Sequence, residues 1–305
     1  MDTTYYADIF SKAVGMDSIL FNEPMSKHTT YKIGGNCDVM LLPENDDEVL
    51  ALIKLCRHNN IPFYVMGNGS NLLVRDGGVR GAVIKISSKM SEVKACGNKI
   101  VAQAGALLGN VVKVAYENCL SGLEFATGIP GAIGGAITMN AGAYGGNMQQ
   151  VVSSVRACDT DGNVIELKAD ELNFGYRQSV VRSNRLTVLS CELELVPRNK
   201  ADIKEKMDTL SAKRRAMQPL SLPSCGSVFK RPEGHYIGKL IEEAGLKGTT
   251  VGGAQVSQLH ANFIVNIDNA TAKDVLDLIE VVKARVYQTF NVQIETEVIV
   301  IGEDL

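Results

Sequence analysis

One stretch, residues 126–146, constrains what this chain can fold into more than any other. It contains seven glycines in 21 residues, and no Asp, Glu, Lys or Arg occurs between Glu124 and Arg156. Glycine is costly in regular structure, so a dense run of it implies backbone that takes left-handed dihedrals or approaches another group closely. Main-chain N–H groups in such loops form anion-binding nests. We interpret the stretch as a cradle for a large, partly apolar ligand that carries phosphate. A glycine-rich loop packed in the core is the alternative.

A second uncharged glycine loop occurs earlier in the chain. A strand at residues 37–42, a helix that Asn45 can cap and a strand at residues 63–66 form a predicted β-α-β unit. The sequence Gly67-Asn68-Gly69-Ser70-Asn71 follows it directly. It begins like the Rossmann fingerprint, but residue 72 is leucine instead of glycine and a strand, not a helix, is expected next. The loop can still offer N–H and hydroxyl groups to a pyrophosphate.

Charge and cysteine usage narrow the class of protein. The net charge of −3 provides no global basic field for nucleic acid. The first residues, Met1-Asp2-Thr3-Thr4, do not resemble a secretory signal, and Pro130 and Asn140 interrupt the uncharged stretch, so it is not a membrane span. The seven cysteines form no C-x-x-C pair, which favours reduced thiols in the cytosol and excludes a zinc site of that pattern. We therefore expect a cytoplasmic protein with no metal and with neither nucleic acid nor membrane as a partner.

The rest of the chain alternates strands and helices in an α+β arrangement. Residues 1–35 are expected to be peripheral, with a short helix followed by a loop. Asp161-Gly162 and Gly97-Asn98 indicate hairpins, and a helix is expected at residues 107–118. Pro197-Arg198-Asn199-Lys200 is a plausible domain boundary, after which helices are predicted at 201–217, 237–244 and from Thr271. The last strand is expected at residues 297–301.

Six motifs in order resemble one enzyme family. They are Gly67-Asn68-Gly69-Ser70-Asn71-Leu72-Leu73-Val74, Thr127-Gly128-Ile129-Pro130-Gly131, Met139-Asn140-Ala141-Gly142-Ala143-Tyr144-Gly145, Phe174-Gly175-Tyr176-Arg177-Gln178-Ser179, Ser224-Cys225-Gly226-Ser227-Val228-Phe229-Lys230 and Glu295-Thr296-Glu297-Val298. The chain resembles the UDP-N-acetylenolpyruvoylglucosamine reductases, flavoenzymes of bacterial peptidoglycan precursor synthesis, over residues 28–302. The resemblance implies an α+β fold class, with an FAD-binding domain of the vanillyl-alcohol-oxidase type at residues 1–197 and a C-terminal α+β substrate domain at 198–305. The first domain divides into subdomains at about 30–90 and 91–197.

The resemblance also implies the cofactors and the reaction. Non-covalent FAD, reduced by NADPH, converts the enolpyruvyl ether of a UDP-sugar to a lactyl ether, and flavin carries the hydride chemistry. The residues expected to bind the cofactor come from the two glycine loops: Gly67, Asn68, Gly69, Ser70, Asn71, Leu72, Thr127, Gly128, Pro130, Gly131, Gly134, Gly135, Asn140, Ala141, Gly142 and Tyr144.

Three residues are expected to be catalytic. Arg177 would hold the substrate carboxylate through its planar fork, Glu297 would polarise it, and Ser227 would donate a proton to C2. Because an ionised Glu297 would repel the growing charge, we infer that this residue is protonated or bridged by water. The alternatives are a surface arginine, a solvated strand glutamate and a turn serine that caps its own backbone.

Basic residues near the serine motif are candidates for the UDP phosphates. Among Lys213, Arg214, Arg215, Lys230 and Arg231 we expect Arg214 and Lys230 to bind them, although a charge run at a helix end is commonly solvated. Arg177 lies close to the strand expected from residue 186, so the chain resembles the branch of the family without a lid loop. Ile299 occupies a position where many members carry arginine, which puts any contact by that side chain in doubt.

Two other functions compete with this interpretation. A flavin oxidase or dehydrogenase that acts on an alcohol would share the FAD-binding fold, and such enzymes often attach flavin through His or Cys. A non-catalytic nucleotide-binding protein would be colourless and would not turn over NADPH. A yellow protein that NADPH bleaches without oxygen would separate the three. We expect a monomer.

Overall fold

The computed structural model describes residues 3–305, and the chain divides into two compact units. Unit 1 contains Met1–Phe21, Val39–Asn68 and Gly81–Arg214, and unit 2 contains Asn22–Asp38, Gly69–Arg80 and Arg215–Leu305. The domain boundary expected after Pro197 remains a prediction. Within residues 3–305, no helix is both long and apolar enough to cross a lipid bilayer.

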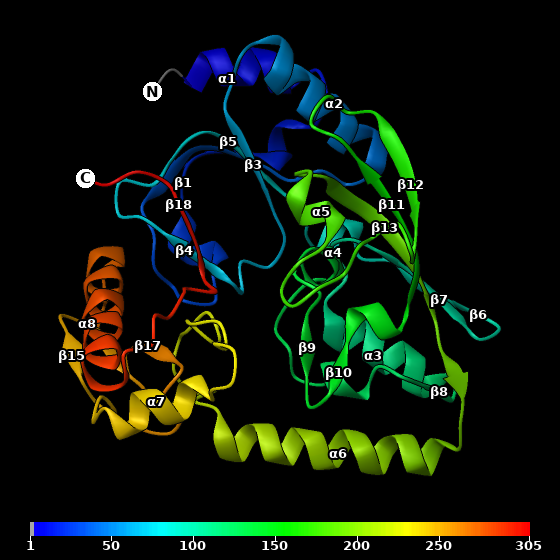
Figure 1. The fold of residues 1–305 in the computed structure, drawn as a ribbon. Helices are drawn as coiled ribbons and strands as arrows, with labels where there is room; N and C mark the ends of the chain where they lie inside the picture. Colours follow the sequence, from blue (N-terminus) through cyan, green and yellow to red (C-terminus); the bar gives the residue numbers. More distant parts are fainter. Residues whose placement is uncertain (1–2) are drawn as a thin grey trace. The chain divides into compact units, whose positions relative to one another are not determined.

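Unit 1 is built around a five-stranded antiparallel sheet in the order β12-β11-β13-β7-β6 (Figure 1). Its strands are β6 (Val93–Cys96), β7 (Lys99–Gln103), β11 (Val152–Cys158), β12 (Val164–Lys168) and β13 (Thr187–Glu194). β6 pairs with β7, and β11 with β12, so both hairpins expected at Gly97-Asn98 and Asp161-Gly162 are confirmed. Alternation along β13 buries Leu189, Cys191 and Leu193 in the core of this unit.

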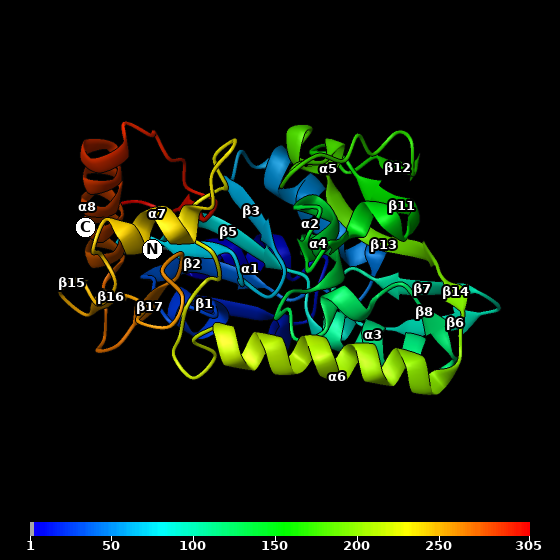
Figure 2. The same cartoon turned by 60° about the horizontal axis from the view of Figure 1, so that its bottom comes forward.

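Helices pack on this sheet and along its edge. α3 (Leu108–Glu117) and α4 (Ile133–Thr138) contribute Val111, Ala115 and Ile137 to the same core. α6 (Lys200–Met217) runs beside α3 in both ribbon views (Figures 1 and 2), and Lys200 lies 4.9 Å from the Tyr116 ring centroid. Shorter elements complete this part of the chain: β8 (Leu120–Ser121), β9 (Gly142–Ala143), β10 (Gly146–Asn147), α5 (Val180–Ser183) and β14 (Val196–Pro197).

A four-stranded sheet has the order β1-β2-β5-β3. Its strands are β1 (Ile19–Pro24), β2 (Asn36–Leu41), β3 (Phe63–Met66) and β5 (Val79–Lys85). α2 (Asp46–His58) follows β2, and the Asn45 side chain accepts a hydrogen bond from Glu48 N, which confirms the expected cap. α1 (Thr3–Phe10) agrees with the short helix expected near the N-terminus. The loop expected up to residue 35 is wrong in part, because Ile19–Pro24 forms a strand.

Unit 2 combines a small antiparallel sheet with two helices. The strands β15 (Thr250–Val251), β16 (Ala254–Val256) and β17 (Ile264–Asn266) pair in that order. α7 (Ile237–Glu243) and α8 (Ala272–Phe290) bury Leu240, Ile241, Leu278 and Val282 in the core of this unit. Thr271 forms a capping box with Asp274 at the start of α8. β4 (Leu72–Val74) pairs in parallel with β18 (Ile299–Ile301).

Two predictions from the sequence need correction. The glycine stretch is not entirely loop, because residues 133–138 form α4. Its first N–H groups bond to carbonyls elsewhere in unit 1, Ile133 N to Ala106 O at 2.8 Å and Gly134 N to Ala104 O at 3.0 Å, and these contacts overcome the poor helix propensity of glycine. The last strand starts at Ile299 instead of Glu297, because the N–H groups of Glu297 and Val298 point to Val228 O.

Candidate functional site

In unit 1 the ends of the two glycine loops lie together. The Asn68 side-chain amide donates to Pro130 O, and a Cβ on Gly67 would lie 3.3 Å from Ala132 Cβ. The first loop enters this contact directly from β3. The structure thus brings together two segments 62 residues apart that the sequence singled out separately.

The glycines of residues 126–146 fall into two groups. A Cβ on Gly134 would lie 3.0 Å from Ala104 Cβ, and a Cβ on Gly146 would lie 2.6 Å from the Phe125 side chain. These glycines are required by packing within the chain. A Cβ on Gly135 or Gly145 would meet no heavy atom within 4 Å, so the chain itself does not use the space beside them. The packed-core interpretation therefore holds at Gly134 and Gly146, and the ligand cradle stays a prediction at Gly135 and Gly145.

The donor groups of these loops fit a diphosphate-bearing cofactor. Within the described chain, the N–H groups of Gly67 and Asn68 donate no hydrogen bond to another residue. The Thr127 hydroxyl is buried and has no partner within residues 3–305. A buried unpaired hydroxyl is costly, so a ligand oxygen at this place would remove the penalty. These orphaned donors fit the expected FAD.

The turn that carries Arg177 is attached to the glycine stretch. Asn140 is 5% exposed, and its side chain donates to Gly175 O at 2.9 Å and accepts from Gln149 N at 3.0 Å. The hydroxyl of Ser179 donates to Thr138 O at 2.8 Å. Arg177 adopts a left-handed backbone (φ 55°) between these two attachments, and its guanidinium lies 5.2 Å from the Tyr176 ring centroid. Asn140 therefore positions the Arg177 turn, and its expected contact with the cofactor stays a prediction.

Two cations at the end of α6 also reach the glycine stretch. The side-chain nitrogen of Lys213 and the guanidinium of Arg214 both lie 5.4 Å from the Tyr144 ring centroid. Arg214 is 7% exposed and its Nε donates to Thr127 O at 3.1 Å. Burial lowers the pKa of the Arg214 guanidinium, which Tyr144 partly offsets. Arg214, expected to bind substrate phosphate, thus contacts two residues expected to bind the cofactor.

In unit 2 the segments that carry Ser227 and Glu297 are neighbours. Glu297 N donates to Val228 O at 2.7 Å, and Phe229 pairs with Thr296 in an isolated bridge. Asn71 of the first glycine loop joins them, because its side chain donates to Glu297 O at 3.3 Å and its carbonyl accepts from Ile299 N at 3.0 Å. Glu297 is 9% exposed and Ser227 is half-buried. One unit therefore holds two expected catalytic residues and part of the first glycine loop.

Lys230 and Thr30 lie at the ends of the serine motif. Lys230 Nζ forms an ion pair with Glu295 at 2.7 Å, so a substrate phosphate would have to replace that carboxylate. The Thr30 hydroxyl donates to Ser224 O at 2.7 Å, and Thr30 N donates to Gly69 O at 3.4 Å. Thr30 is not among the site residues expected from the sequence, although it belongs to the first residues of the family resemblance.

Two buried groups, Tyr31 and the Cys225 thiol of this motif, were given no role from the sequence. The Tyr31 hydroxyl has no hydrogen-bond partner within the described residues, and burial and nearby Cys225 raise the pKa of Tyr31. Burial and the charge of Glu297 raise the pKa of Cys225 to about 12, so this thiol is inert at neutral pH. A core tyrosine has no local sequence pattern, so composition and spacing could not have identified Tyr31.

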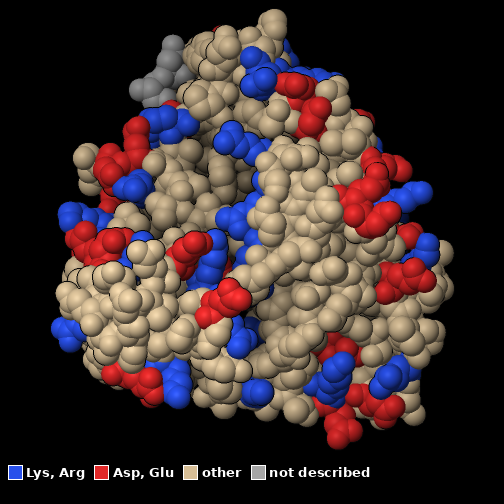
Figure 3. Space-filling view, viewed as in Figure 1, with Lys and Arg blue, Asp and Glu red and all other residues tan. Residues whose placement is uncertain are grey.

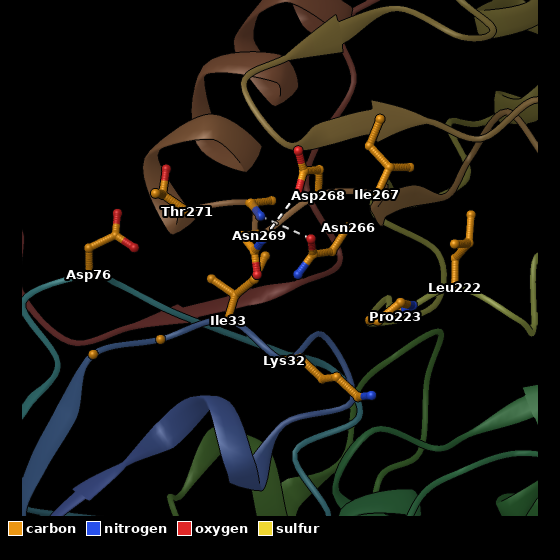
Figure 4. Close-up of a pocket in the computed structure, with 13 residues that line it drawn as sticks. Lys32, Ile33, Asp76, Leu222, Pro223, Asn266, Ile267, Asp268, Asn269 and Thr271 are labelled. Atoms are coloured by element: carbon orange, nitrogen blue, oxygen red, sulfur yellow. Dashed lines mark hydrogen bonds between the residues drawn. The ribbon is translucent and has the colours of Figure 1, made fainter.

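A separate cavity of about 600 Å³ lies in unit 2 (Figure 4). It is lined by Lys32, Asp76, Pro223 and the segment from Asn266 to Thr271, and none of the expected site residues contributes to it. The Asp76 carboxylate accepts from Ala272 N and Lys273 N at the start of α8, so its role is to cap that helix. On the face shown in Figure 3, acidic and basic side chains are intermixed, in line with the small net charge. Residues 3–305 contain no cluster of ligands for a metal ion.

Comparisons with known proteins agree with the motifs. One family model, the FAD binding domain, matches residues 37–168, and a second, the C-terminal domain of UDP-N-acetylenolpyruvoylglucosamine reductase, matches residues 218–301. The chain is 49% identical over 304 residues to the UDP-N-acetylenolpyruvoylglucosamine reductase of Alkaliphilus oremlandii, with 100% of both chains covered.

Solved structures extend the comparison to the fold. The UDP-N-acetylenolpyruvylglucosamine reductase of Thermus caldophilus matches with a TM-score of 0.79 and 36% identity, over 92% of this chain and 97% of that one. An alkyldihydroxyacetonephosphate synthase matches with a TM-score of 0.51 and 15% identity, over 65% of this chain and 41% of that one, a likeness of fold alone. The expected α+β fold class with an FAD-binding domain is confirmed.

Proposed function

Because the chain belongs to the UDP-N-acetylenolpyruvoylglucosamine reductase family, we propose that it performs this reaction with the residues described above. It is an FAD-dependent oxidoreductase of peptidoglycan precursor synthesis, and NADPH is the reductant. It reduces UDP-N-acetylglucosamine enolpyruvate to UDP-N-acetylmuramate. When bound, FAD supplies the transfer of hydride to the enolpyruvyl double bond.

The two glycine loops would hold FAD without a covalent bond. The N–H groups of Gly67 and Asn68 and the hydroxyl of Thr127 have no acceptor within the described chain, so they are available for the diphosphate. Gly135, with open space beside it, would allow the cofactor close approach. The contact between Asn68 and Pro130 fixes one loop against the other before the cofactor arrives.

Three side chains would handle the substrate. Hydride addition places negative charge on the carboxylate, and Arg177 would neutralise it through two parallel hydrogen bonds. Glu297 would polarise the same group. C2 then needs a proton, and Ser227 would donate it, because a strongly basic carbanion-like centre needs only a weak acid at close range. Arg214 and Lys230 would contact the UDP phosphates. We place the reaction in the cytoplasm and propose a monomer without a lid loop.

The observation that carries the catalytic assignment is the hydrogen bond from Glu297 N to Val228 O at 2.7 Å. It places the backbone of the proposed polarising residue beside the residue that follows the proposed proton donor. Asn71 attaches the first glycine loop to the same place. Asn71 and Glu297, which are 226 positions apart in the sequence, are therefore joined beside the segment that carries the proposed proton donor.

Ser227→Ala tests the proposal through its two half-reactions. NADPH reduction of the flavin does not use the proton for C2, so bleaching should keep a near-native rate in rapid-mixing absorbance. Reoxidation by the enolpyruvyl substrate should slow by a factor on the order of 10²–10⁴, the usual contribution of a positioned acid. If bleaching slowed instead, Ser227 would be structural or would serve NADPH. If reoxidation stayed fast, another group would deliver the proton.

A further inference from the structure

We infer that Asn262 is a positioning residue for the proposed proton donor, an inference that rests on the role proposed for Ser227. Asn262 is 5% exposed. Its side-chain oxygen accepts from Phe229 N at 3.0 Å, and its side-chain nitrogen donates to Phe229 O at 3.0 Å. Its main-chain carbonyl also accepts from Val228 N at 2.9 Å. One buried residue therefore holds three polar groups of the two residues that follow Ser227.

The fourth main-chain polar group of Val228 and Phe229, the Val228 carbonyl, also has a hydrogen-bond partner. Val228 O accepts from Glu297 N at 2.7 Å, so all four main-chain polar groups of Val228 and Phe229 are fixed. Ser227 itself pairs with Phe263, the residue after Asn262, in an isolated bridge. Gly226 has φ 81° and open space around its missing Cβ, a backbone state that glycine adopts without a steric penalty. Asn262 supplies three of the four hydrogen bonds that hold the two residues C-terminal to Ser227.

The pairing with Phe229 requires a side chain that both donates and accepts. An amide does this with the spacing of a neighbouring strand, and Asn262 substitutes for a strand partner at Phe229. Aspartate has the same shape, but its carboxylate would face the Phe229 carbonyl without a proton between them. Alanine would leave two buried main-chain groups unpaired. The consequence for catalysis is geometric: a displacement of about 1 Å at a reacting group can cost about 10²-fold in rate.

The test compares Asn262→Ala and Asn262→Asp with Asn266→Ala as a matched control. Asn266 lies in the same unit, and its side chain also makes two hydrogen bonds but none to residues 227–229. It accepts from Ala270 N at 2.9 Å (Figure 4), and it donates to Tyr31 O at 3.3 Å. Asn262→Ala should slow reoxidation by the enolpyruvyl substrate about 10- to 100-fold and leave NADPH bleaching within about twofold. Asn266→Ala should lower the melting temperature and change neither half-reaction.

A pH profile covers the case in which the alanine variant does not fold. A buried carboxyl group that faces a carbonyl has a raised pKa, so Asn262→Asp should regain its donor as the pH falls. Reoxidation by this variant should therefore accelerate toward acidic pH relative to the native chain. A profile parallel to the native one would overturn the inference, since a purely structural residue would not add a titration to this half-reaction.

A double variant separates this inference from the proposed function. If Asn262 acts through Ser227, then Asn262→Ala in a Ser227→Ala background should slow reoxidation by less than about twofold more, because coupled residues are not additive. Full multiplication of the two effects would refute the positioning role. A fast Ser227→Ala enzyme would instead refute the proton-donor assignment itself. A slow Ser227→Ala enzyme with fast Asn262 variants would refute only the inference.

Discussion

Two adjacent glycines of α4 should respond in opposite ways to alanine. Gly134 is buried, and its added Cβ would lie 3.0 Å from Ala104 Cβ and 3.2 Å from Ala104 O. Gly135 is exposed, and its added Cβ would meet no heavy atom within 4 Å. Neither residue needs a positive φ. Gly134→Ala should therefore lower the free energy of unfolding by about 1–3 kcal/mol through overpacking, whereas Gly135→Ala should raise it by up to about 1 kcal/mol through better helix propensity.

The effect of Gly135→Ala on cofactor affinity should have the other sign. If FAD lies against the open side of Gly135, a methyl group there displaces it, and the dissociation constant should rise on the order of 10- to 100-fold, about 1.4–2.8 kcal/mol. Urea unfolding of the apoprotein and quenching of FAD fluorescence measure the two quantities separately. The Gly135→Ala apoprotein should be more stable than the native apoprotein, and it should gain less stability than the native chain when FAD is added.

Each glycine can refute its part of this reasoning. FAD bound by Gly135→Ala with native affinity would show that the cofactor does not approach α4 there. A Gly134→Ala apoprotein as stable as the native chain would show that the close contact with Ala104 is not needed for packing. Loss of both stability and affinity in Gly135→Ala would mean that the space beside this residue is filled by the protein in solution.

Two further substitutions test the surroundings of the glycine loops. Glu124 is 2% exposed, and burial opposes the ionisation of its carboxyl group. Hydrogen bonds from Ser121, the backbone and Lys206 outweigh burial and hold the pKa of Glu124 below its ordinary value of 4.5. Because the pKa of Glu124 is lower in the folded state, its ionisation stabilises the fold above pH 4.5, and this stability is lost as the pH falls through the folded pKa. In urea titrations, Glu124→Gln should therefore lower the free energy of unfolding by about 1–3 kcal/mol at neutral pH and by progressively less below pH 4.5. Equal stability of the two proteins at pH 7 would contradict this. Tyr31→Phe removes a buried hydroxyl without a partner in the described chain and should leave the melting temperature unchanged or raise it; a loss above about 1 kcal/mol would reveal a bound water or ligand at that oxygen.

The sequence identified elements and motifs where local chemistry decides the structure. The Asn45 cap, the hairpin at Gly97-Asn98 and the helix from Thr271 depend on neighbours a few residues away, and all are confirmed. The strand β1 and the helix α4 were not predicted. α4 contains two glycines in six residues, and it exists because carbonyls of Ala104 and Ala106 satisfy its first N–H groups. Such tertiary partners are not visible in a local pattern.

In the candidate site, too, local patterns were predicted from the sequence and tertiary contacts were not. The motif residues were identified in advance, but their supports were not. Asn262 contacts Phe229 across 33 residues, and Asn140 contacts Gly175 across 35. An asparagine in a loop is normally read as a turn former, because its local preference is strong. Whether it instead holds a distant backbone segment depends on which segments the fold places beside it, and the sequence alone does not contain that information.

The uncharged stretch gains its positive charge from another part of unit 1. A fixed carboxylate among residues 125–155 would repel a diphosphate, and the sequence has none there. α6 supplies two cations, Lys213 and Arg214, which both lie against the Tyr144 ring. The side chain of Arg214 also packs against Gly128, because a Cβ on Gly128 would lie 2.9 Å from Arg214 Cδ. Because Arg214 also bonds to Thr127 O, removing it would alter the cofactor loop together with any phosphate contact. A change in substrate KM on losing Arg214 therefore assigns this residue to the substrate only when the affinity for FAD is measured in the same variant and found unchanged.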